Sequence, residues 1–464
     1  MHVVPDGPVC RRGDGEFHDH DDERETDRMT KNIFVIGLDA DNARVLERLP
    51  DAENYKFHGL LTPEELQHGE IDIVGLLDKA TEELAAFEGR IDAIVGFWDF
   101  PAATLVPLLC EQHGLPHVPL EAVLKCEHKY WSRLEQRAVI DETPPFGIVD
   151  LDEEEPGLPE GMSFPVWLKP VKSFSSELAF HVTDQEDFAA AVTEIRQGVG
   201  RVGNPFDHVL GKVDLPPEIA SVGGAACLAE AELSGVQAAV EGYVWNGEVT
   251  VYAALDSIDY PERSSFLRHQ YPSQLPDDVV RRMEDAAQLV MPRICFDNAT
   301  FSIEFFCDVG TAQVSLLEIN PRHSQSHAEL FELVDGVANH DIMVRLGLGE
   351  APKPRDSHGP YRIAGRWYLR RFSRDAVVTR APTEAEIAAL EQKIDGVAID
   401  VSPREGQRLS ELPEQDSYSY ELAQILIAAQ SEREMEQKYE RCVAELRFEF
   451  AEGVRTGAWS SLQQ

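Results

Sequence analysis

Three oxygen-bearing side chains lie on two neighbouring segments that have the pattern of buried strands. Glu318 and Asn320 are two residues apart in the apolar segment 316–322, so on a strand both point to the same face. Glu304 lies on the preceding apolar segment, and residues 308–311 have the composition of a hairpin turn between the two. Buried carboxylates need a cation or a hydrogen-bond donor, and hard oxygen ligands of this kind hold Mg²⁺, which usually accompanies phosphate. The alternative is that Glu304 lies on a solvent-facing side of its strand.

Basic side chains stand out because the chain is strongly acidic. It has 42 lysines and arginines against 83 aspartates and glutamates, which gives a net charge of −41. Lys169 ends an apolar strand-like segment, where an unpaired ammonium is costly, so we expect an anion beside it. Lys125, Lys129 and Arg133 recur every four residues along one face of a predicted helix, 121–140. The alternative for this stripe is a solvated helix face paired with neighbouring glutamates.

The composition narrows the class of protein. The acidic balance argues against nucleic-acid binding, which needs a basic surface. No apolar segment reaches the ~18–20 residues of a membrane span, and the charged N-terminus lacks the apolar core of a signal peptide. The 7 cysteines are scattered without the spacing of a disulfide framework or a zinc site. We therefore expect a cytoplasmic protein that acts without nucleic acid or membrane, and a homodimer is left open.

The N-terminal part has the pattern of an open α/β sheet. Strand-like segments at 33–37 and 91–96 are each followed by a polar loop and a helix, and residues 117–118 give another short strand. Trp98 and Asp99 follow the second strand, where they either contact substrate or pack and cap the next helix.

The rest of the chain alternates hairpins and helices. Hairpins are predicted over 164–182 and 238–252, and helices over 184–196, 276–293 and 328–347. Residues 197–226 are rich in glycine and proline, so we expect a long irregular insertion. The last third has a strand pattern at 361–372 and helices near 384–393 and 431–444.

These features follow one another in an order that resembles the ATP-grasp superfamily of ATP-dependent carboxylate–amine ligases. The similarity includes the D-alanine–D-alanine ligase and biotin carboxylase types. It rests on Lys129, Lys169 with its serine-rich loop, Val-Glu-Gly-Tyr-Val at 240–244, Glu248, Glu304 and Glu-Ile-Asn-Pro-Arg at 318–322. It covers roughly residues 31–350. One departure is that no glycine occurs between Lys169 and Phe180, although the loop that covers phosphate in this family is usually rich in glycine.

The resemblance implies an α/β (α+β) fold of the ATP-grasp type with several domains. The expected divisions are a disordered acidic tail at 1–30, a Rossmann-like pre-ATP-grasp domain at 31–125, an ATP-grasp domain at 126–350 with a lid subdomain at about 160–245, and a C-terminal subdomain at 351–464.

The resemblance also implies ATP and Mg²⁺ (or Mn²⁺) as cofactors. The metal ions would be held by Glu304, Glu318 and Asn320. The phosphates would be contacted by Lys129 and Lys169 and covered by a loop that includes Ser175 and Ser176. The nucleoside would be contacted by Glu241, by the backbone at Val244 and, at the ribose, by Glu248.

Arg322 and Lys169 are the catalytic residues that the resemblance implies. Arg322 would stabilise the transferred phosphoryl group or hold the substrate carboxylate. The substrate region would include Arg268, His323 and His327, and either histidine could take a proton from the amine.

The expected reaction activates a carboxylate as an acyl phosphate and joins it to an amine, on amino-acid or peptide-like substrates. A biotin-carboxylase-like enzyme that activates bicarbonate is the first alternative. A nucleotide-binding protein without catalysis is the second.

Overall fold

The computed structural model describes residues 30–67, 69–173, 177–263, 265–353, 358–412 and 419–452. Its N-terminal part contains a three-stranded parallel sheet in the order β2-β1-β3. The elements are β1 (Lys31–Ile36), α1 (Ala40–Leu46), η1 (Ala52–Asn54), β2 (Tyr55–Leu60), α2 (Pro63–Gln67), α3 (Ile73–Ala85), β3 (Ala93–Gly96) and α4 (Ala102–His113). Both predicted strand–loop–helix units are therefore confirmed.

The strand expected at residues 117–118 is absent, and these residues are irregular. They lie between Pro116 and Pro119, and proline supplies no backbone N–H for a strand ladder. The preceding Gly114 has a φ of +63° and ends α4 as a left-handed cap.

A four-stranded antiparallel sheet, here called the small sheet, follows in the order β4-β7-β5-β6. The elements of this part are α5 (Leu120–Glu127), α6 (Lys129–Arg137), β4 (Phe146–Val149), β5 (Val166–Pro170), β6 (Phe180–Val182), α7 (Gln185–Gly198) and β7 (Cys227–Ala231). The helix expected over 121–140 is thus two helices, because His128 leaves the helical conformation and caps the second one. The hairpin expected over 164–182 is confirmed.

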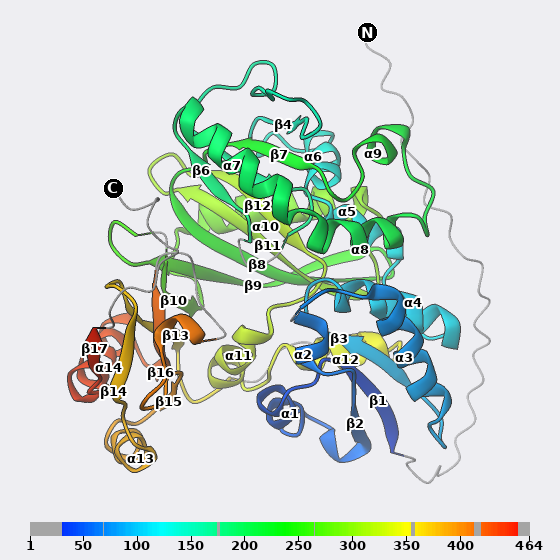
Figure 1. Ribbon diagram of the computed structural model, residues 1–464. Coiled ribbons are helices and arrows are strands. Elements are labelled where there is room, and N and C mark those ends of the chain that lie inside the picture. Colours follow the sequence, from blue (N-terminus) through cyan, green and yellow to red (C-terminus); the bar gives the residue numbers. More distant parts are fainter. Residues whose placement is uncertain are drawn as a thin grey trace.

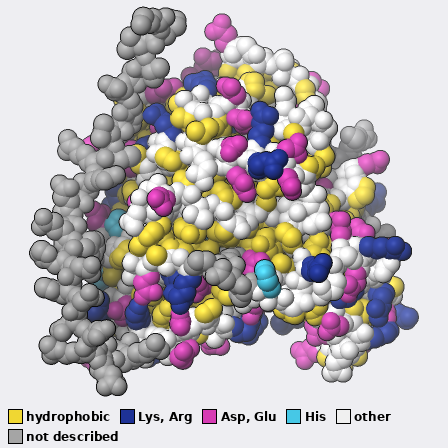
Figure 2. Space-filling view, turned by 180° about the vertical axis from the view of Figure 1, so that it is seen from behind, with side chains coloured by type: hydrophobic (Ala, Val, Ile, Leu, Met, Phe, Trp, Pro, Cys, Tyr) yellow, Lys and Arg dark blue, Asp and Glu magenta, His cyan; other side chains and the backbone are white. Residues whose placement is uncertain are grey.

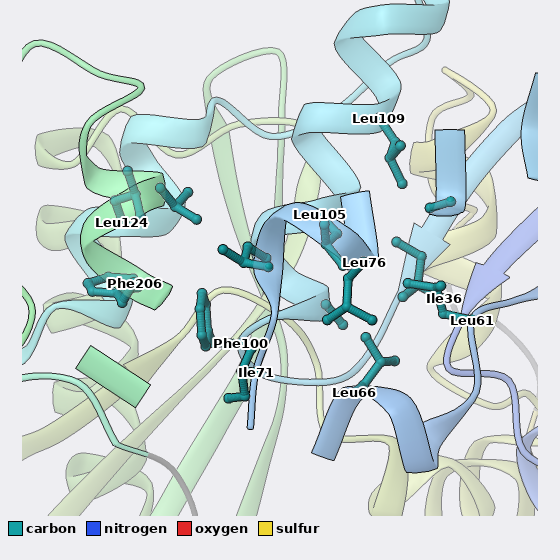
Figure 3. Packing of buried hydrophobic residues seen from close by; sticks show 14 of the residues in the cluster. Ile36, Leu61, Leu66, Ile71, Leu76, Phe100, Leu105, Leu109, Leu124 and Phe206 are labelled. Carbon is teal, nitrogen blue, oxygen red and sulfur yellow. The ribbon is translucent and has the colours of Figure 1, made fainter. Parts of the chain in front are cut away.

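Residues 197–226 are largely helical, which corrects the expectation of an irregular insertion. They contain α8 (Gly200–Leu210) and α9 (Pro217–Val222). Pro205 stands inside α8 and lowers its intrinsic helix propensity. The helix nevertheless forms because its apolar face is buried, with Phe206 fully inaccessible in the core of the N-terminal part. Figure 3 shows Phe206 reaching this core beside residues of the N-terminal part.

The large sheet has eight antiparallel strands in the order β12-β11-β8-β9-β10-β13-β16-β15. Its strands are β8 (Val236–Trp245), β9 (Glu248–Asp259), β10 (Phe266–Tyr271), β11 (Ala299–Asp308), β12 (Gln313–Asn320), β13 (Ile363–Arg371), β15 (Val397–Val401) and β16 (Tyr420–Ala429). Helix α10 (Asp277–Arg293) packs against β8, β9, β11 and β12. The large sheet runs through the middle of the molecule, with the small sheet above it and the N-terminal sheet beside it (Figure 1).

The remaining elements follow β12 in the chain. They are η2 (Gln325–His327), α11 (Ala328–Asp335), α12 (His340–Gly347), β14 (Ala376–Arg380), α13 (Glu384–Lys393), η3 (Leu409–Glu411), α14 (Glu432–Glu445) and β17 (Glu449–Glu452). The helix expected over 328–347 is therefore broken in two, and Gly336, with φ of +82°, ends the first half. None of the described helices is long and apolar enough to span a bilayer. Acidic side chains are dispersed over the face shown in Figure 2.

Candidate functional site

The three predicted oxygen donors lie together on one face of the large sheet. Glu304 of β11 stands directly opposite Glu318 of β12, and Asn320 Nδ2 donates to Glu304 Oε1 at 3.1 Å. Gln237 of β8 donates from Nε2 to Glu304 Oε2 at 2.9 Å. Burial and the charge of Glu318 raise the pKa of Glu304. Two carboxylates facing each other across a ladder are unfavourable without a cation.

This donor set suits a magnesium ion that also binds phosphate. The described residues contain no cluster of three or more His, Cys, Asp or Glu side chains that could hold a metal ion. Two carboxylates and an amide are too few for a cage made of protein alone. They match Mg²⁺, which keeps several waters and takes the remaining oxygens from phosphates. The repulsion between Glu304 and Glu318 is the physical reason to expect a cation there.

Lys129 and Lys169 lie beside the acidic pair. Lys129 Nζ donates to Glu318 Oε1 at 2.8 Å and to the Ser173 carbonyl at 2.9 Å. Lys169 Nζ is 2.5 Å from Glu230 Oε2. Burial alone would raise the pKa of Glu318, but Lys129 and Lys169 hold it below its usual value. The site therefore places the ammonium of Lys129 against Glu318 of the large sheet, while Lys169 pairs with Glu230 of the small sheet and acts on Glu318 through its charge.

Arg133 and Glu230 form a buried ion pair beneath these lysines. Arg133 Nε donates to Glu230 Oε1 at 2.6 Å, and its Nη1 and Nη2 donate to the carbonyls of Leu316 and Leu317 at 2.8 and 2.7 Å. Only 2% and 5% of the two side chains are exposed. Burial would raise the pKa of Glu230, but Arg133 and Lys169 lower it to about 2.

This pair decides between the two interpretations of the basic stripe. Lys125, Lys129 and Arg133 are all buried, so the stripe is not a solvated helix face, although Lys125 does pair with a neighbouring glutamate, Glu121. Glu230 was not singled out in the sequence. The sequence could have indicated it, because Glu230 is the only acidic residue in the apolar strand β7, just as Lys169 is the only basic residue in β5.

Lys172 is a further buried lysine that the sequence argument did not use. It forms an ion pair with Glu127 of α5, and only 3% of each side chain is exposed. Its ammonium also lies 5.6 Å from the ring of Phe100 and 5.8 Å from the ring of Phe206. Burial lowers the pKa of Lys172 to about 8 although Asp99 and Glu318 act in the opposite direction.

Arg322 binds a carboxylate of the N-terminal part. Its Nε and Nη2 donate to Asp99 Oδ1 and Oδ2 at 2.8 and 2.7 Å, in the bidentate geometry that arginine and carboxylate prefer. Burial alone would raise the pKa of Asp99, but Arg322 holds it below its usual value. Of the two interpretations of Asp99, helix capping is not what the structure shows, because Pro101 precedes α4 without a side-chain cap.

The residues expected to contact the nucleoside lie elsewhere or are already engaged. Glu241 is fully buried, and its carboxylate accepts from His327 Nδ1, Tyr252 Oη and Asn339 Nδ2 at 2.7, 2.7 and 3.0 Å. Such a carboxylate has little capacity left for adenine. This placement corrects the expectation for Glu241.

Val244 and Glu248 lie farther along the same hairpin. Val244 packs in the core under α10, and its backbone is paired with β9 and β11 on both sides. Glu248 is exposed and pairs with Trp245, whereas Glu304 pairs with Ala239. Six residues of strand separate these levels, which is about 20 Å. The structure therefore does not bring Glu248 to the lysines.

The three residues expected to line the substrate region have different surroundings. Arg268 donates to Gln270 and Glu432 at 2.8 and 2.6 Å and stacks on Trp367, so it is held toward α14 and away from the acidic pair. His327 contacts the buried Glu241 and lies 5.4 Å from the ring of His269.

His323 belongs to a buried chain of hydrogen bonds. Its Nδ1 is 3.0 Å from Thr300 Oγ1, its Nε2 is 2.8 Å from His340 Nδ1, and His340 Nε2 is 2.9 Å from Asn42 Oδ1 on α1. His323 and His340 are both completely inaccessible, and burial lowers the pKa of His340 to about 4. His323 therefore joins the segment after Arg322 to the N-terminal part, which corrects its expected role at the substrate. Ser175 and Ser176 lie outside the described residues.

Comparisons with known proteins agree with this fold. Residues 162–328 match the family model of the ATP-grasp domain. A comparison with curated protein sequences gives no match.

Solved structures similar to the chain include an L-amino acid ligase from Bacillus licheniformis, with a TM-score of 0.66, 15% identity, and coverage of 91% of this chain and 99% of that one. Phosphoribosylglycinamide synthetase from Anaerococcus prevotii has a TM-score of 0.61 and 12% identity, over 91% of this chain and 100% of the other. Biotin carboxylase from Campylobacter jejuni has a TM-score of 0.58 and 14% identity, over 92% and 93%. Residues 162–328 therefore match an ATP-grasp domain, and the chain has the ATP-grasp fold over about nine-tenths of its length.

Proposed function

We propose that the chain is an ADP-forming ligase that activates a carboxylate with ATP and joins it to an amine, on amino-acid or peptide-like substrates. The observation that carries this proposal is the grouping of Lys129, Lys169 and Arg322 around Glu304 and Glu318, three cations beside two facing carboxylates on an ATP-grasp fold. Polyphosphate with magnesium satisfies both sets of charges at once.

Each group has a distinct task in such a reaction. Lys129 and Lys169 would hold ATP phosphates, and Glu304, Glu318 and Asn320 would hold Mg²⁺ (or Mn²⁺), which supplies positive charge to the transferring phosphoryl group when bound. Arg322 would orient the carboxylate that attacks the γ-phosphorus.

The chemistry has two balanced steps. A carboxylate oxygen takes the γ-phosphoryl group, which gives an acyl phosphate and ADP. The amine nitrogen then attacks the acyl carbon, phosphate leaves, and the amine's proton passes to solvent or a base. Phosphorylation is needed because a carboxylate oxygen is a poor leaving group.

The similar structures favour amino acids among the possible substrates. An L-amino acid ligase is among them, and it is similar over nearly its whole length. A biotin carboxylase is also among them, which keeps bicarbonate activation as a second candidate. A protein without catalysis is disfavoured because the charged groups that the reaction needs are present and face one another.

Release of ADP and capture of the acyl phosphate test this proposal. The purified chain is incubated with ATP, Mg²⁺ and the standard L-amino acids, one at a time and in pairs, and ADP is measured. Hydroxylamine serves as a general amine that converts an acyl phosphate to a hydroxamate. Hydroxamate that depends on one added carboxylate supports the ligase. ADP release that needs bicarbonate and biotin supports the second candidate, and ATP binding with no turnover contradicts both.

A further inference from the structure

Asp99 and Arg322 join two parts of the fold at the edge of the site. Asp99 follows β3 of the N-terminal sheet and Arg322 follows β12 of the large sheet, 223 residues later. The other buried pairs nearby, Arg133–Glu230 and Lys172–Glu127, are closed to solvent. The Asp99–Arg322 pair keeps 32% and 15% of its side chains exposed, so a small molecule can reach it.

Both partners retain hydrogen-bonding capacity after they bind each other. A guanidinium has five N–H donors, and Arg322 gives two of them to Asp99. Its Nη1 makes a long contact of 3.4 Å with the His323 carbonyl. Each oxygen of Asp99 accepts one bond from Arg322, and a carboxylate offers about four acceptor positions. The pair therefore presents a free donor edge beside a free acceptor edge.

We propose that this pair binds the carboxylate substrate as a free α-amino acid, with its carboxylate on Arg322 and its ammonium on Asp99; the proposal rests on the ligase function above. An α-amino acid carries a carboxylate and an ammonium on the same carbon, so its two opposite charges are adjacent, as those of the ion pair are. A zwitterion can therefore add to the pair with each charge opposite its complement, which a plain carboxylate cannot do.

The surroundings orient this zwitterion. Arg322 lies two residues after Asn320, whose side chain contacts Glu304, so Arg322 follows β12 at the acidic pair, where the γ-phosphoryl group is expected. A substrate carboxylate on Arg322 would be held toward that group. Lys172 also acts on Asp99 through its charge, but its ammonium is paired with Glu127, so the printed hydrogen bonds to Asp99 come from Arg322 alone. The N-terminal part of the chain would thus recognise the substrate's ammonium through Asp99.

The proposal is tested by comparing substrates that have the same carboxylate and differ only in whether they carry an ammonium. The best L-amino acid in the hydroxamate assay is compared with its deamino counterpart and with its N-acetyl derivative. The wild-type protein should favour the free amino acid by about 10-fold or more in kcat/KM, as expected for loss of a hydrogen bond to a charged group. A best substrate that lacks an ammonium would overturn the proposal, and this comparison needs no variant.

Asp99→Asn then separates ammonium recognition from the positioning of Arg322. The amide still accepts a bond from Arg322 but has lost the charge, so the preference for the free amino acid should fall to within about 3-fold, and Asp99→Glu should restore part of it. A purely positioning role would lower both substrates equally and leave the ratio unchanged. Asp41→Asn, which changes an exposed carboxylate paired with Arg44, is the matched control. Absence of hydroxamate with every carboxylate would instead reject the ligase function.

Discussion

The negative charge of Glu318 is only partly neutralised by the residues that it contacts. Lys129 neutralises one of its oxygens, while Glu304 faces it across the ladder. A metal between the two carboxylates would complete this balance, and its loss should stop phosphoryl transfer without disturbing the strands. Substitutions at different residues of the site should therefore have different effects: some should lower turnover, some nucleotide affinity and some stability.

Glu318→Gln should lower ADP release at least about 100-fold, because an amide cannot provide the charge that holds the metal at the phosphates. The side chain keeps its shape and can still accept from Lys129, so the melting temperature should change little. Glu111→Gln, an exposed position on α4, is the matched control. Near-normal turnover in the Glu318 variant would show that this carboxylate holds no essential metal.

Lys169→Ala should weaken ATP binding about 10-fold or more, because it removes a charge-assisted contact to phosphate. A nucleotide titration followed by fluorescence or calorimetry measures the affinity directly. Lys212→Ala removes an exposed lysine and should leave affinity unchanged. Equal affinities in the two variants would remove Lys169 from the phosphate site.

Glu230 should make the free energy of unfolding fall as the pH is lowered. Its pKa is about 2 in the folded chain, below the ordinary value of 4.5, so its ionised form stabilises the fold above about pH 4.5 and this contribution is lost as pH falls toward 2. The loss should be about 1 kcal/mol at pH 4 and about 2 kcal/mol at pH 3. Urea unfolding of the wild type and Glu230→Gln should show a stability gap that narrows by these amounts. A gap that is constant from pH 7 to pH 3 would contradict the pairing with Arg133 and Lys169.

Much of the site could be predicted from local sequence, and its partners could not. Glu304, Glu318 and Asn320 were found because strand periodicity places them on one face across a short turn. Asp99 and Glu230 lie 223 and 97 residues from their arginines, and no local pattern joins such pairs. Glu241 was expected to contact the nucleoside, but a glutamate inside an apolar strand can equally accept several hydrogen bonds from buried neighbours, as it does here.

At the scale of elements, α8 shows where composition misleads. Glycine and proline predicted an irregular segment over 197–226, whereas burial of Phe206 outweighs the propensity of these residues. Gly203 has a specific reason to lack a side chain, because a Cβ there would lie 2.7 Å from the Gly224 carbonyl. The helix is thus held close to the segment that leads into β7.

Gly203→Ala should destabilise the fold by about 1–3 kcal/mol, because the added methyl group forces α8 away from the 224–225 backbone. Gly211→Ala is the matched control, since its nearest contact would be an ordinary 3.6 Å and its φ of −64° suits alanine. Chemical unfolding of both variants measures the difference. A Gly203 variant as stable as the Gly211 variant would show that α8 can shift without loss.

At the scale of the whole molecule, the large sheet passes through the central and C-terminal parts without a break. Strand β10 pairs with β13, and β16 and β15 continue from there. The three strands that residues after 350 add to this sheet therefore cover an edge that would otherwise present open backbone groups. Two hairpins of this sheet, β8–β9 and β11–β12, were predicted from their turns, but the strand order depends on pairings between distant segments.

A chain that ends at residue 350 should aggregate, because it exposes the edge of β10 that pairs with β13 and removes Ala364 and Ala428 from the core around Phe331. Size-exclusion chromatography of the truncated and complete chains compares their association states. A monomeric truncated chain that still binds ATP would show that the first five strands of the large sheet are stable alone.

Because Lys129 connects two sheets at the candidate site, ligand binding there should raise the thermal stability of the chain. Its ammonium contacts the Ser173 carbonyl of the small sheet's hairpin and Glu318 of the large sheet, so a nucleotide bound there would join the same two parts. A ligand that binds only the folded state stabilises it by about 2.7 kcal/mol at 100 times its Kd. Shifts in melting temperature can thus rank nucleotides, metals and amino acids by affinity before any product has been identified.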